Sequence, residues 1–183
     1  MLTGNHQDLF STALIAYLPR LRRYATALAG SVSVADDLVQ DCVERALRRA
    51  DTLNDPERMA GWLRSILLHL YMDMLRLQRS RGTGVDLTLV DNDLALSVPP
   101  ADRGATIDFI RAINGLSTEH RQILLLVGLE GLNYREIAEE LGIPMGTVMS
   151  RLARARERLR NALDKEQNLN SAEQQSSVRR LEL

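Results

Sequence analysis

Cysteine, aromatic residues and long apolar runs are scarce in this chain of 183 residues. The single cysteine, Cys42, excludes an internal disulfide and fits a reducing cytoplasm, which is the location we expect. No apolar run approaches the ~20 residues needed to cross a bilayer, so we expect no membrane insertion. The N-terminal segment lacks the basic stretch followed by an apolar stretch that marks a secretory signal. With aromatics at 4%, the core must be built mainly from aliphatic side chains.

The signatures of catalysis and of cofactor binding are also missing. The histidines His6, His69 and His120 are scattered, and no HExxH motif, cysteine pair or GxxxxGK phosphate loop occurs. Asp36 and Asp37 are adjacent on a predicted helix, so their carboxylates point about 100° apart and do not converge on one substrate. We therefore predict that the protein is not an enzyme and has no cofactor, no metal and no small-molecule substrate.

Charge is unevenly distributed, although the formal net charge is only −1. Between Thr147 and Lys165, six basic residues stand against two acidic ones, a local charge of +4. Between Gly82 and Gly104, four aspartates stand against one arginine, a local charge of −3. The cationic segment near the C-terminus therefore indicates an anionic partner such as nucleic acid.

Hydrophobic periodicity predicts an all-α protein made of two small helical domains joined by a linker. We expect the first domain at residues 1–81, the linker at 82–105, the second domain at 106–165 and a flexible tail at 166–183. The linker is predicted from its glycines, paired prolines and scattered aspartates. The predicted helices span residues 7–29, where Pro19 would allow a bend, 33–47, 56–79, 106–114, 118–129, 134–141 and 145–164.

Apolar residues recur every three or four positions in the second and third predicted helices, which gives each helix one buried stripe. Ser33 is the expected N-cap of the second helix, with Asp36 at the position of a capping-box acid. The stripe of this helix comprises Ala35, Leu38, Val39, Cys42, Val43, Ala46 and Leu47, so Cys42 is interpreted as a packing residue. The stripe of the third helix comprises Met59, Leu63, Ile66, Leu67, Leu70, Met74 and Leu77.

The strongest motif is a helix-turn-helix at residues 133–152. Asn133 and Glu136 can form a capping box at the start of its first helix. Gly142 supplies a left-handed turn, and Pro144 sets the start of the second helix. The apolar residues between the helices are Ile137, Ala138, Leu141, Ile143, Val148 and Leu152.

The outward residues of the second helix suit duplex DNA, because a recognition helix offers short polar groups to base edges and arginines to phosphates. The alternative is an ordinary amphipathic helical hairpin with an arginine-rich solvated face. The glycine turn at Gly142, the small residue Ala138 and the aliphatic residues between the helices disfavour this alternative. Base-edge contacts are assigned to Ser150 and Arg154, with Thr147, Met149 and Ala153 adjacent. Phosphate or flanking contacts are assigned to Arg135, Arg151, Arg156 and Arg158.

Two sets of motifs resemble the extracytoplasmic-function (ECF) sigma factors of bacterial RNA polymerase. LSTEHRQILLL (116–126) and EGLNYREIAEELGIPMGTVMSRLARAR (130–156) resemble region four of that family. ADDLVQD (35–41), GWLRSI (61–66) and DMLR (73–76) resemble region two. The resemblance covers about residues 8–81 and 106–164 in the family's order.

The resemblance implies a role for each domain. In the family, region two binds the clamp coiled coil of the largest polymerase subunit and captures unpaired bases of the −10 element. Region four reads the −35 element as duplex DNA and sits on the flap of the other large subunit. The expected partners are therefore core RNA polymerase, promoter DNA and an anti-sigma factor that clamps both domains across the linker.

An acidic face of the second predicted helix supplies the expected polymerase contacts. Such a face often serves only to keep a helix solvated, but the resemblance favours docking on a basic helix pair of the polymerase. We assign this role to Asp36, Asp37, Leu38, Gln40, Asp41 and Glu44, although Leu38 also belongs to the buried stripe.

The third predicted helix and the loop before it supply the expected −10 contacts. Trp62 is either a core residue or a wall of the pocket for a flipped base. His69 stands where the family commonly has asparagine. The assigned residues are Asn54, Asp55, Trp62, Arg64, His69, Asp73, Arg76 and Arg79, among which Arg64, Arg76 and Arg79, together with Arg81, are expected to contact phosphates.

Two other functions remain open from the sequence. A transcriptional regulator that works without core polymerase would need a sensor, receiver or dimerisation module, and residues 1–104 show neither a βα alternation nor clear heptads. A sigma-like decoy that only sequesters an anti-sigma protein could look very similar. The lack of an attached receiver-like domain counts against the decoy.

Overall fold

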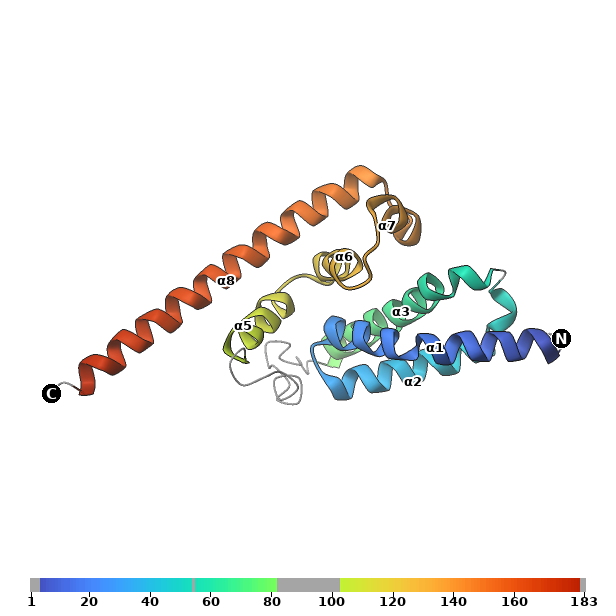
Figure 1. The fold of residues 1–183 in the computed structure, drawn as a ribbon, viewed down its shortest axis with the longest axis horizontal. Coiled ribbons are helices and arrows are strands. Elements are labelled where there is room, and N and C mark those ends of the chain that lie inside the picture. Colours follow the sequence, from blue (N-terminus) through green and yellow to red (C-terminus); the bar gives the residue numbers. More distant parts are fainter. Residues whose placement is uncertain (1–3, 54, 82–102, 182–183) are drawn as a thin grey trace. The chain divides into compact units, whose positions relative to one another are not determined.

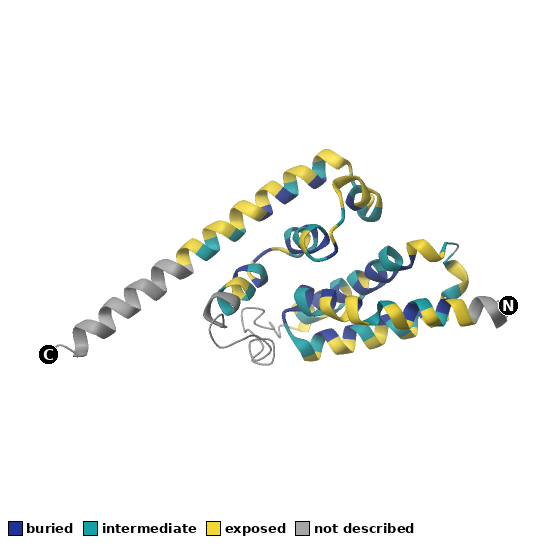
Figure 2. Ribbon diagram, in the orientation of Figure 1, coloured by how far each residue is buried: buried dark blue, intermediate teal, exposed yellow. Residues whose placement is uncertain are grey.

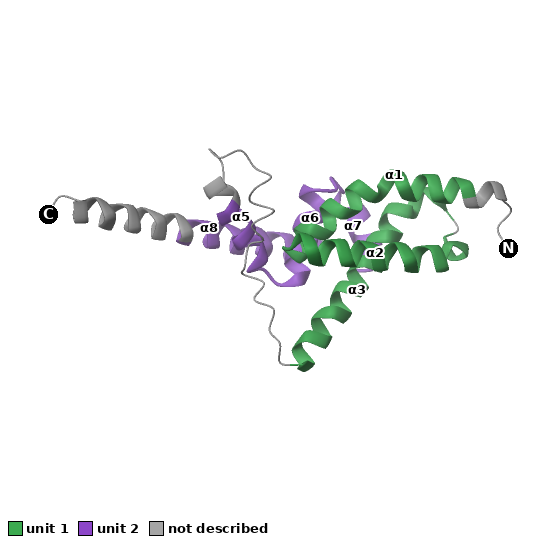
Figure 3. Ribbon diagram, turned by 90° about the horizontal axis from the view of Figure 1, so that it is seen from below, with its two compact units in different colours: residues 1–91 green, residues 92–183 purple. Residues whose placement is uncertain are grey.

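The computed structural model describes the backbone of residues 4–53, 55–81 and 103–181, and the side chains of 8–53, 55–81 and 107–165. In these ranges the regular elements are α-helices and 3-10 helices, and no strand occurs, which confirms the all-α prediction (Figure 1). The chain divides into two compact units, residues 1–91 and 92–183 (Figure 3). The predicted linker at 82–105 falls largely outside the described residues.

Unit 1 is built from three long helices, α1 (Gly4–Ala29), α2 (Val32–Arg48) and α3 (Met59–Arg81). Each packs against the other two, and their buried residues lie along the faces that meet (Figure 2). α1 continues through Pro19. The core of this unit comprises Phe10, Leu14, Leu21, Tyr24, Ala25, Leu28, Ala29, Ala35, Leu38, Cys42, Ala46, Met59, Leu63, Ile66, Leu67, Tyr71 and Leu75.

A two-residue connection joins α1 to α2. Gly30 has a φ of 75°, a conformation that suits glycine, and it ends α1 with a hydrogen bond from its amide to the Thr26 carbonyl at 2.8 Å. Ser31 follows in extended conformation and caps α2, because its hydroxyl oxygen accepts from the Val34 amide at 3.5 Å. The predicted cap at Ser33 is therefore wrong, since the chain turns two residues earlier and places Ser33 inside the helix.

The buried stripe of α3 also differs from the prediction. Met59, Leu63, Ile66 and Leu67 are buried as expected, but the stripe continues through Tyr71 and Leu75. Leu77 was predicted to face inward and is 49% exposed. In α2, the outermost stripe residue, Leu47, is 54% exposed. Both errors lie near helix ends, where the neighbouring helices, rather than the helical period, decide which residues are covered.

Unit 2 contains α5 (Arg103–Asn114), α6 (Thr118–Gly128), α7 (Tyr134–Leu141) and the long α8 (Met145–Leu181). α5, α6 and α7 each pack against α8. The predicted end of α8 at residue 164 is wrong, since helical backbone continues to Leu181 where a flexible tail was expected. No glycine or proline follows Lys165 in the sequence, so nothing local stops the helix.

A buried arginine joins α5 to α6. Arg121 is only 2% exposed, and its guanidinium donates to the carbonyl oxygens of Ile113 at 3.1 Å, Leu116 at 3.4 Å and Asn114. These carbonyls lie at or just beyond the C-terminal end of α5, where backbone acceptors lack helical partners. Arg121 therefore satisfies the end of one helix from the first turns of the next.

Candidate nucleic-acid interface

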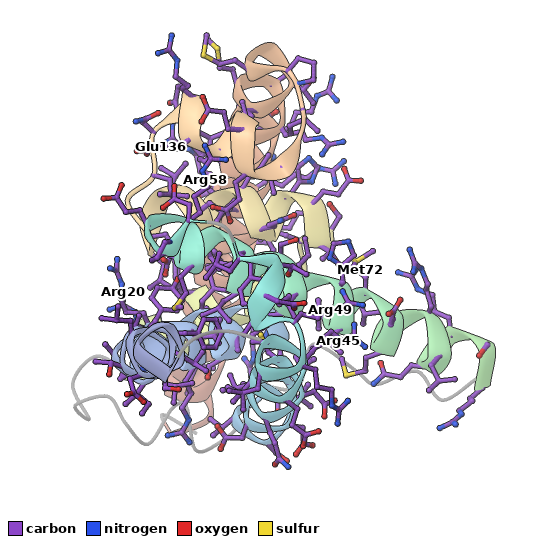
Figure 4. The ribbon with its side chains drawn as sticks, turned by 90° about the vertical axis from the view of Figure 1, so that its right-hand side faces the viewer. Arg20, Arg45, Arg49, Arg58, Met72 and Glu136 are labelled. Atoms are coloured by element: carbon purple, nitrogen blue, oxygen red, sulfur yellow. The ribbon has the colours of Figure 1, made fainter. Side chains whose placement is uncertain are left out.

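The turn between α7 and α8 has the predicted helix-turn-helix chemistry. The Asn133 side chain accepts from the amides of Arg135 and Glu136, both at 3.0 Å, while the Glu136 carboxylate accepts from the Asn133 amide at 2.7 Å. Glu136 (labelled in Figure 4) thus completes a capping box on the first turn of α7. These contacts confirm the predicted start of the motif.

A left-handed glycine then reverses the chain. Gly142 has a φ of 63°, and the amide of Ile143 reaches back to the Ala138 carbonyl at 3.1 Å. The Pro144 carbonyl accepts from the amides of Thr147 at 2.8 Å and Val148 at 3.2 Å, which opens α8. The two helices are therefore joined by three residues, 142–144. Figure 1 shows the short turn between them.

Apolar side chains set the angle between α7 and α8. Ile137 and Val148 are fully buried, and Leu152 and Ala155 continue the buried edge of α8. Ile143 and Ala138 are half-buried at the turn. Because only this narrow edge is covered, most of the surface of α8 between residues 145 and 165 stays accessible (Figure 2).

The residues assigned to base contacts lie on that accessible surface. Met149, Ser150, Ala153 and Arg154 are exposed, and Thr147 is half-buried. The Ser150 hydroxyl donates to the Thr147 carbonyl at 3.1 Å, a bond that a better acceptor on a ligand could replace. Within the described part of the chain, the Arg154 side chain makes no hydrogen bond or ion pair.

Among the arginines assigned to phosphates, Arg135, Arg156 and Arg158 are exposed. Arg151 is half-buried and pairs with Glu119 of α6, with Nη2 3.3 Å from Oε2. Arg158 Nη1 lies 3.5 Å from Nδ1 of His120, also on α6.

Sequence reasoning did not assign Glu119 or His120 to the interface. His120 Nδ1 also lies 2.9 Å from the Ser117 hydroxyl. Burial lowers the pKa of His120, and the charges of Arg158, Arg151 and Arg154 lower it further, whereas Glu119 raises it. No local sequence pattern indicated that these two residues lie at the interface, because the arginines that they contact on α8 are more than thirty positions away in the sequence.

In unit 1, most of the residues assigned to polymerase binding face solvent. Asp36, Asp37, Gln40, Asp41 and Glu44 are exposed on α2. Asp36 accepts two hydrogen bonds from Arg22 of α1, Nε to Oδ1 at 2.6 Å and Nη2 to Oδ2 at 2.8 Å, and this pairing raises the pKa of Arg22. Glu44 pairs with Arg48 at 3.1 Å.

Leu38 does not belong to that surface. Its side chain is 4% exposed and lies in the core between the helices. Its place in the buried stripe is confirmed, and its assignment to polymerase contact is wrong because a buried side chain has no accessible area to offer a partner.

On α3, the predicted −10 residues fall into two groups. His69, Asp73, Arg76, Arg79 and Arg81 are exposed. The His69 Nδ1 donates to the Ser65 carbonyl at 2.6 Å, and Arg76 donates to Asp73 at 2.9 Å. Trp62 is half-buried and meets Phe10 of α1 edge-on, with ring centroids 6.2 Å apart and an interplanar angle of 76°.

Arg64 is instead a core residue. It is 5% exposed, and its Nη1 donates to the Tyr17 hydroxyl on α1 at 2.7 Å. The predicted phosphate contact of Arg64 is therefore wrong, since its charged group points into the unit. Because Tyr17 lies 47 positions away in the sequence, no pattern close to Arg64 indicated that it would be buried.

The loop between α2 and α3 holds the remaining assigned residues. Asn54 lies outside the described residues. The Asp55 carboxylate accepts from the Glu57 amide at 3.0 Å and thereby caps the short 3-10 helix Pro56–Arg58 (η2). Asp55 also pairs with Arg58 (labelled in Figure 4), Oδ2 to Nε at 3.6 Å. Asp55 therefore shapes the start of α3, and it is half-buried there.

Cys42 is confirmed as a packing residue. It is fully buried, and its thiol donates to the Leu63 carbonyl at 3.4 Å. Burial raises the pKa of Cys42 to about 12. Among the described residues, no cluster of three His, Cys, Asp or Glu has the arrangement of a metal site. No described helix is both long and apolar enough for a membrane span.

The geometry of unit 2 is that of a helix-turn-helix DNA-binding domain, and comparisons with known proteins agree. Residues 107–159 match the family model of sigma-70, region 4, and residues 14–68 match the model of the Sigma2 domain of PhyR. The chain is 32% identical over 154 residues to the ECF RNA polymerase sigma factor EcfG of Rhodopseudomonas palustris, covering 83% of each. It is 27% identical over 168 residues to the ECF RNA polymerase sigma factor SigW of Bacillus subtilis, covering 86% of this chain and 90% of SigW.

A solved structure is similar as well. The sigma factor RpoE of Bartonella quintana, crystallised in complex with the anti-sigma factor NepR, matches with a TM-score of 0.69 and 30% identity. The match covers 85% of this chain and 96% of that one. The chain belongs to the family of ECF RNA polymerase sigma factors.

Proposed function

We propose that this sigma factor binds core RNA polymerase and directs it to promoters that it reads at two separate elements. Region two is assigned to residues 1–81, the linker to 82–105 and region four to 106–165. The observation that carries the proposal is the accessible face of α8, on which Ser150 and Arg154 are exposed. This face belongs to the helix-turn-helix whose first helix, α7, begins with a capping box and ends at Gly142. We further propose that the chain acts in the cytoplasm as a binding protein and not as an enzyme.

Unit 2 reads the −35 element as duplex DNA. Arg154 is exposed at the position where a recognition helix meets base edges, and a guanidinium suits the two acceptors of guanine. Ser150 lies one turn earlier, with Thr147, Met149 and Ala153 beside it. Arg135, Arg151, Arg156 and Arg158 contact phosphates and set the register.

Unit 1 binds polymerase and the −10 element. The exposed acids of α2 (Asp36, Asp37, Asp41 and Glu44) with Gln40 form the polymerase surface, since charge complementarity steers such encounters. Asn54, Asp55 and Trp62 are assigned to contact with a displaced base. His69, Asp73, Arg76 and Arg79 line the exposed side of α3 next to it.

An anti-sigma protein controls access to both units. The support is the similar RpoE of Bartonella quintana, which was crystallised with NepR. In transcription reactions with purified core polymerase, the cognate anti-sigma protein should suppress initiation by this chain and not by an unrelated sigma factor. Suppression of both would contradict specific control.

The function is tested by transcription in vitro with core polymerase and a promoter library. Initiation from a defined promoter class supports the proposal, whereas neither a polymerase-independent regulator nor a decoy would start transcripts. On the selected promoter, Arg154→Ala should cost roughly 1–3 kcal/mol and relax base preference at one position.

Arg151→Ala is the matched variant. It should weaken binding to matched and mismatched promoters alike and reduce the salt dependence of binding. If the two substitutions behave identically on both kinds of promoter, the division between base and phosphate contacts is wrong.

A further inference from the structure

Three arginines form a row along one flank of α8. Arg151, Arg154 and Arg158 are spaced three and four residues apart, so their side chains lie next to one another along the helix. Arg154 and Arg158 are exposed, and Arg151 is half-buried at the border with α6. Arg151 and Arg158 suit phosphates of a DNA backbone, while Arg154 between them keeps its assignment to base edges.

His120 of α6 lies beside this row. Its Nδ1 is 3.5 Å from Nη1 of Arg158 and 2.9 Å from the hydroxyl of Ser117. A guanidinium can only donate, so the ring nitrogen that faces it must be an acceptor. This arrangement favours the neutral imidazole, with Nδ1 as an acceptor that the Arg158 guanidinium and the Ser117 hydroxyl share.

The charges of the three arginines also favour the neutral imidazole. Burial lowers the pKa of His120, followed by the charge of Arg158, and Arg151 and Arg154 act in the same direction. Glu119, on the same helix, opposes them but is itself paired with Arg151 at 3.3 Å. A phosphate placed on the row would cancel the repulsion between the arginines and a protonated imidazole.

We infer that His120 belongs to the DNA-binding surface of unit 2 and takes up a proton from solvent when duplex phosphates bind. Protonation ends the contact of Nδ1 with Arg158, which frees that guanidinium for phosphate and adds a fourth cation to the row. The affinity for duplex DNA must then increase as the pH falls, by linkage between proton and phosphate binding. This inference rests on the proposed DNA binding by unit 2.

The test is binding of the full chain to a fluorescent duplex of scrambled sequence, about 20 base pairs long, which is about two helical turns. Phosphate contacts do not depend on sequence, so no promoter is needed. At constant ionic strength, affinity should rise between about pH 8 and about pH 5.5, a range that spans the ordinary histidine pKa of about 6.5. The rise should reach at most about tenfold for each unit by which phosphates raise the pKa of His120.

Substitutions assign the effect to one residue. His120→Gln should remove most of the pH dependence, whereas His6→Gln, the matched control in unit 1, should retain it. His120→Lys carries a permanent charge and should bind at about pH 8 as tightly as the unmodified chain does at about pH 5.5. In proton NMR, the ring signals of His120 should titrate at higher pH in the DNA complex than in the free chain.

An equal pH dependence in the unmodified chain and in His120→Gln would overturn the inference and leave the proposed function intact. Absence of duplex binding at every pH would overturn both. Circular dichroism shows whether His120→Gln is folded, and Ser117→Ala provides a second variant. Loss of the Ser117 donor should move the binding midpoint to higher pH, and an unmoved midpoint contradicts the inference.

Discussion

The two helices proposed to bind the transcription machinery, α2 and α8, are held in place by different means. α2 packs against both α1 and α3, and Leu38 and Cys42 are among the residues that it buries. α8 meets α7 across a turn of three residues and buries only a narrow edge at that end. The orientation of α2 therefore depends mainly on packing, whereas that of α8 depends on the turn chemistry at its start as well as on packing against α5, α6 and α7.

The largest effect is expected from Leu38→Ala, which tests the packing of α2. Removing a buried leucine should lower the free energy of unfolding of unit 1 by roughly 2–5 kcal/mol. Urea unfolding followed by Trp62 fluorescence measures it, because the only tryptophan of the chain lies in this unit. Leu47→Ala, on the same helix but 54% exposed, should change the value by no more than about 0.5 kcal/mol. Equal effects of Leu38→Ala and Leu47→Ala on the free energy of unfolding would indicate that Leu38 is exposed.

Tyr17→Phe tests the buried contact between α1 and α3. The Arg64 guanidinium would lose an acceptor at 2.7 Å inside the unit, at a cost of about 1.5–3 kcal/mol in the same assay. Arg20→Ala, an exposed change on α1 (Arg20 is labelled in Figure 4), is the control and should have little effect. A neutral Tyr17→Phe would mean that this hydrogen bond does not stabilise unit 1.

Gly142→Ala tests the turn that positions α8. A side chain at a φ of 63° should destabilise unit 2 by about 1–2 kcal/mol. Gly146→Ala, within α8 and without any atom near the added methyl group, should be neutral or slightly stabilising. Thermal unfolding by circular dichroism measures both, and Trp62 fluorescence should report an unchanged unit 1. A matching loss at Gly146 would indicate crowding rather than turn geometry.

The smallest effect concerns pH and the stability of unit 2 without DNA. The pKa of His120 is lowered by folding, so the unfolded state binds the proton more readily. Stability is then fully present above the unfolded pKa of about 6.5 and declines as the pH falls from there toward the folded value. Thermal unfolding at pH values on both sides of 6.5 measures this decline. His120→Gln should flatten it, and an unchanged slope would show that another group is responsible.

The contrast between α2 and α8 also explains what the sequence could predict. The bounds of α7, the Asn133–Glu136 capping box and the left-handed Gly142 were all predictable, because each depends on residues within a few positions. The cap of α2 was predicted wrongly at Ser33, because Ser31, two residues earlier, carries the same side chain. The turn at Gly30 decides between the two serines.

The remaining errors involve contacts between distant parts of the chain. A charged residue such as Arg64 is normally exposed, and its hydrogen bond to Tyr17 on another helix is a contact that the sequence does not reveal. The same holds for His120, whose partner Arg158 lies 38 positions away. Periodicity identifies a buried stripe but not which of its ends a neighbouring helix covers, as the exposed Leu77 and Leu47 illustrate.

The environment of Cys42 has a practical consequence for labelling. The only thiol of the chain is buried and has its pKa raised to about 12, so very little reactive thiolate is present in neutral solution. The folded protein should therefore resist maleimides and mild oxidants without any substitution. A cysteine introduced on the surface of either unit would be the sole attachment point for a dye, and two such sites would allow the separation of the units to be followed by energy transfer.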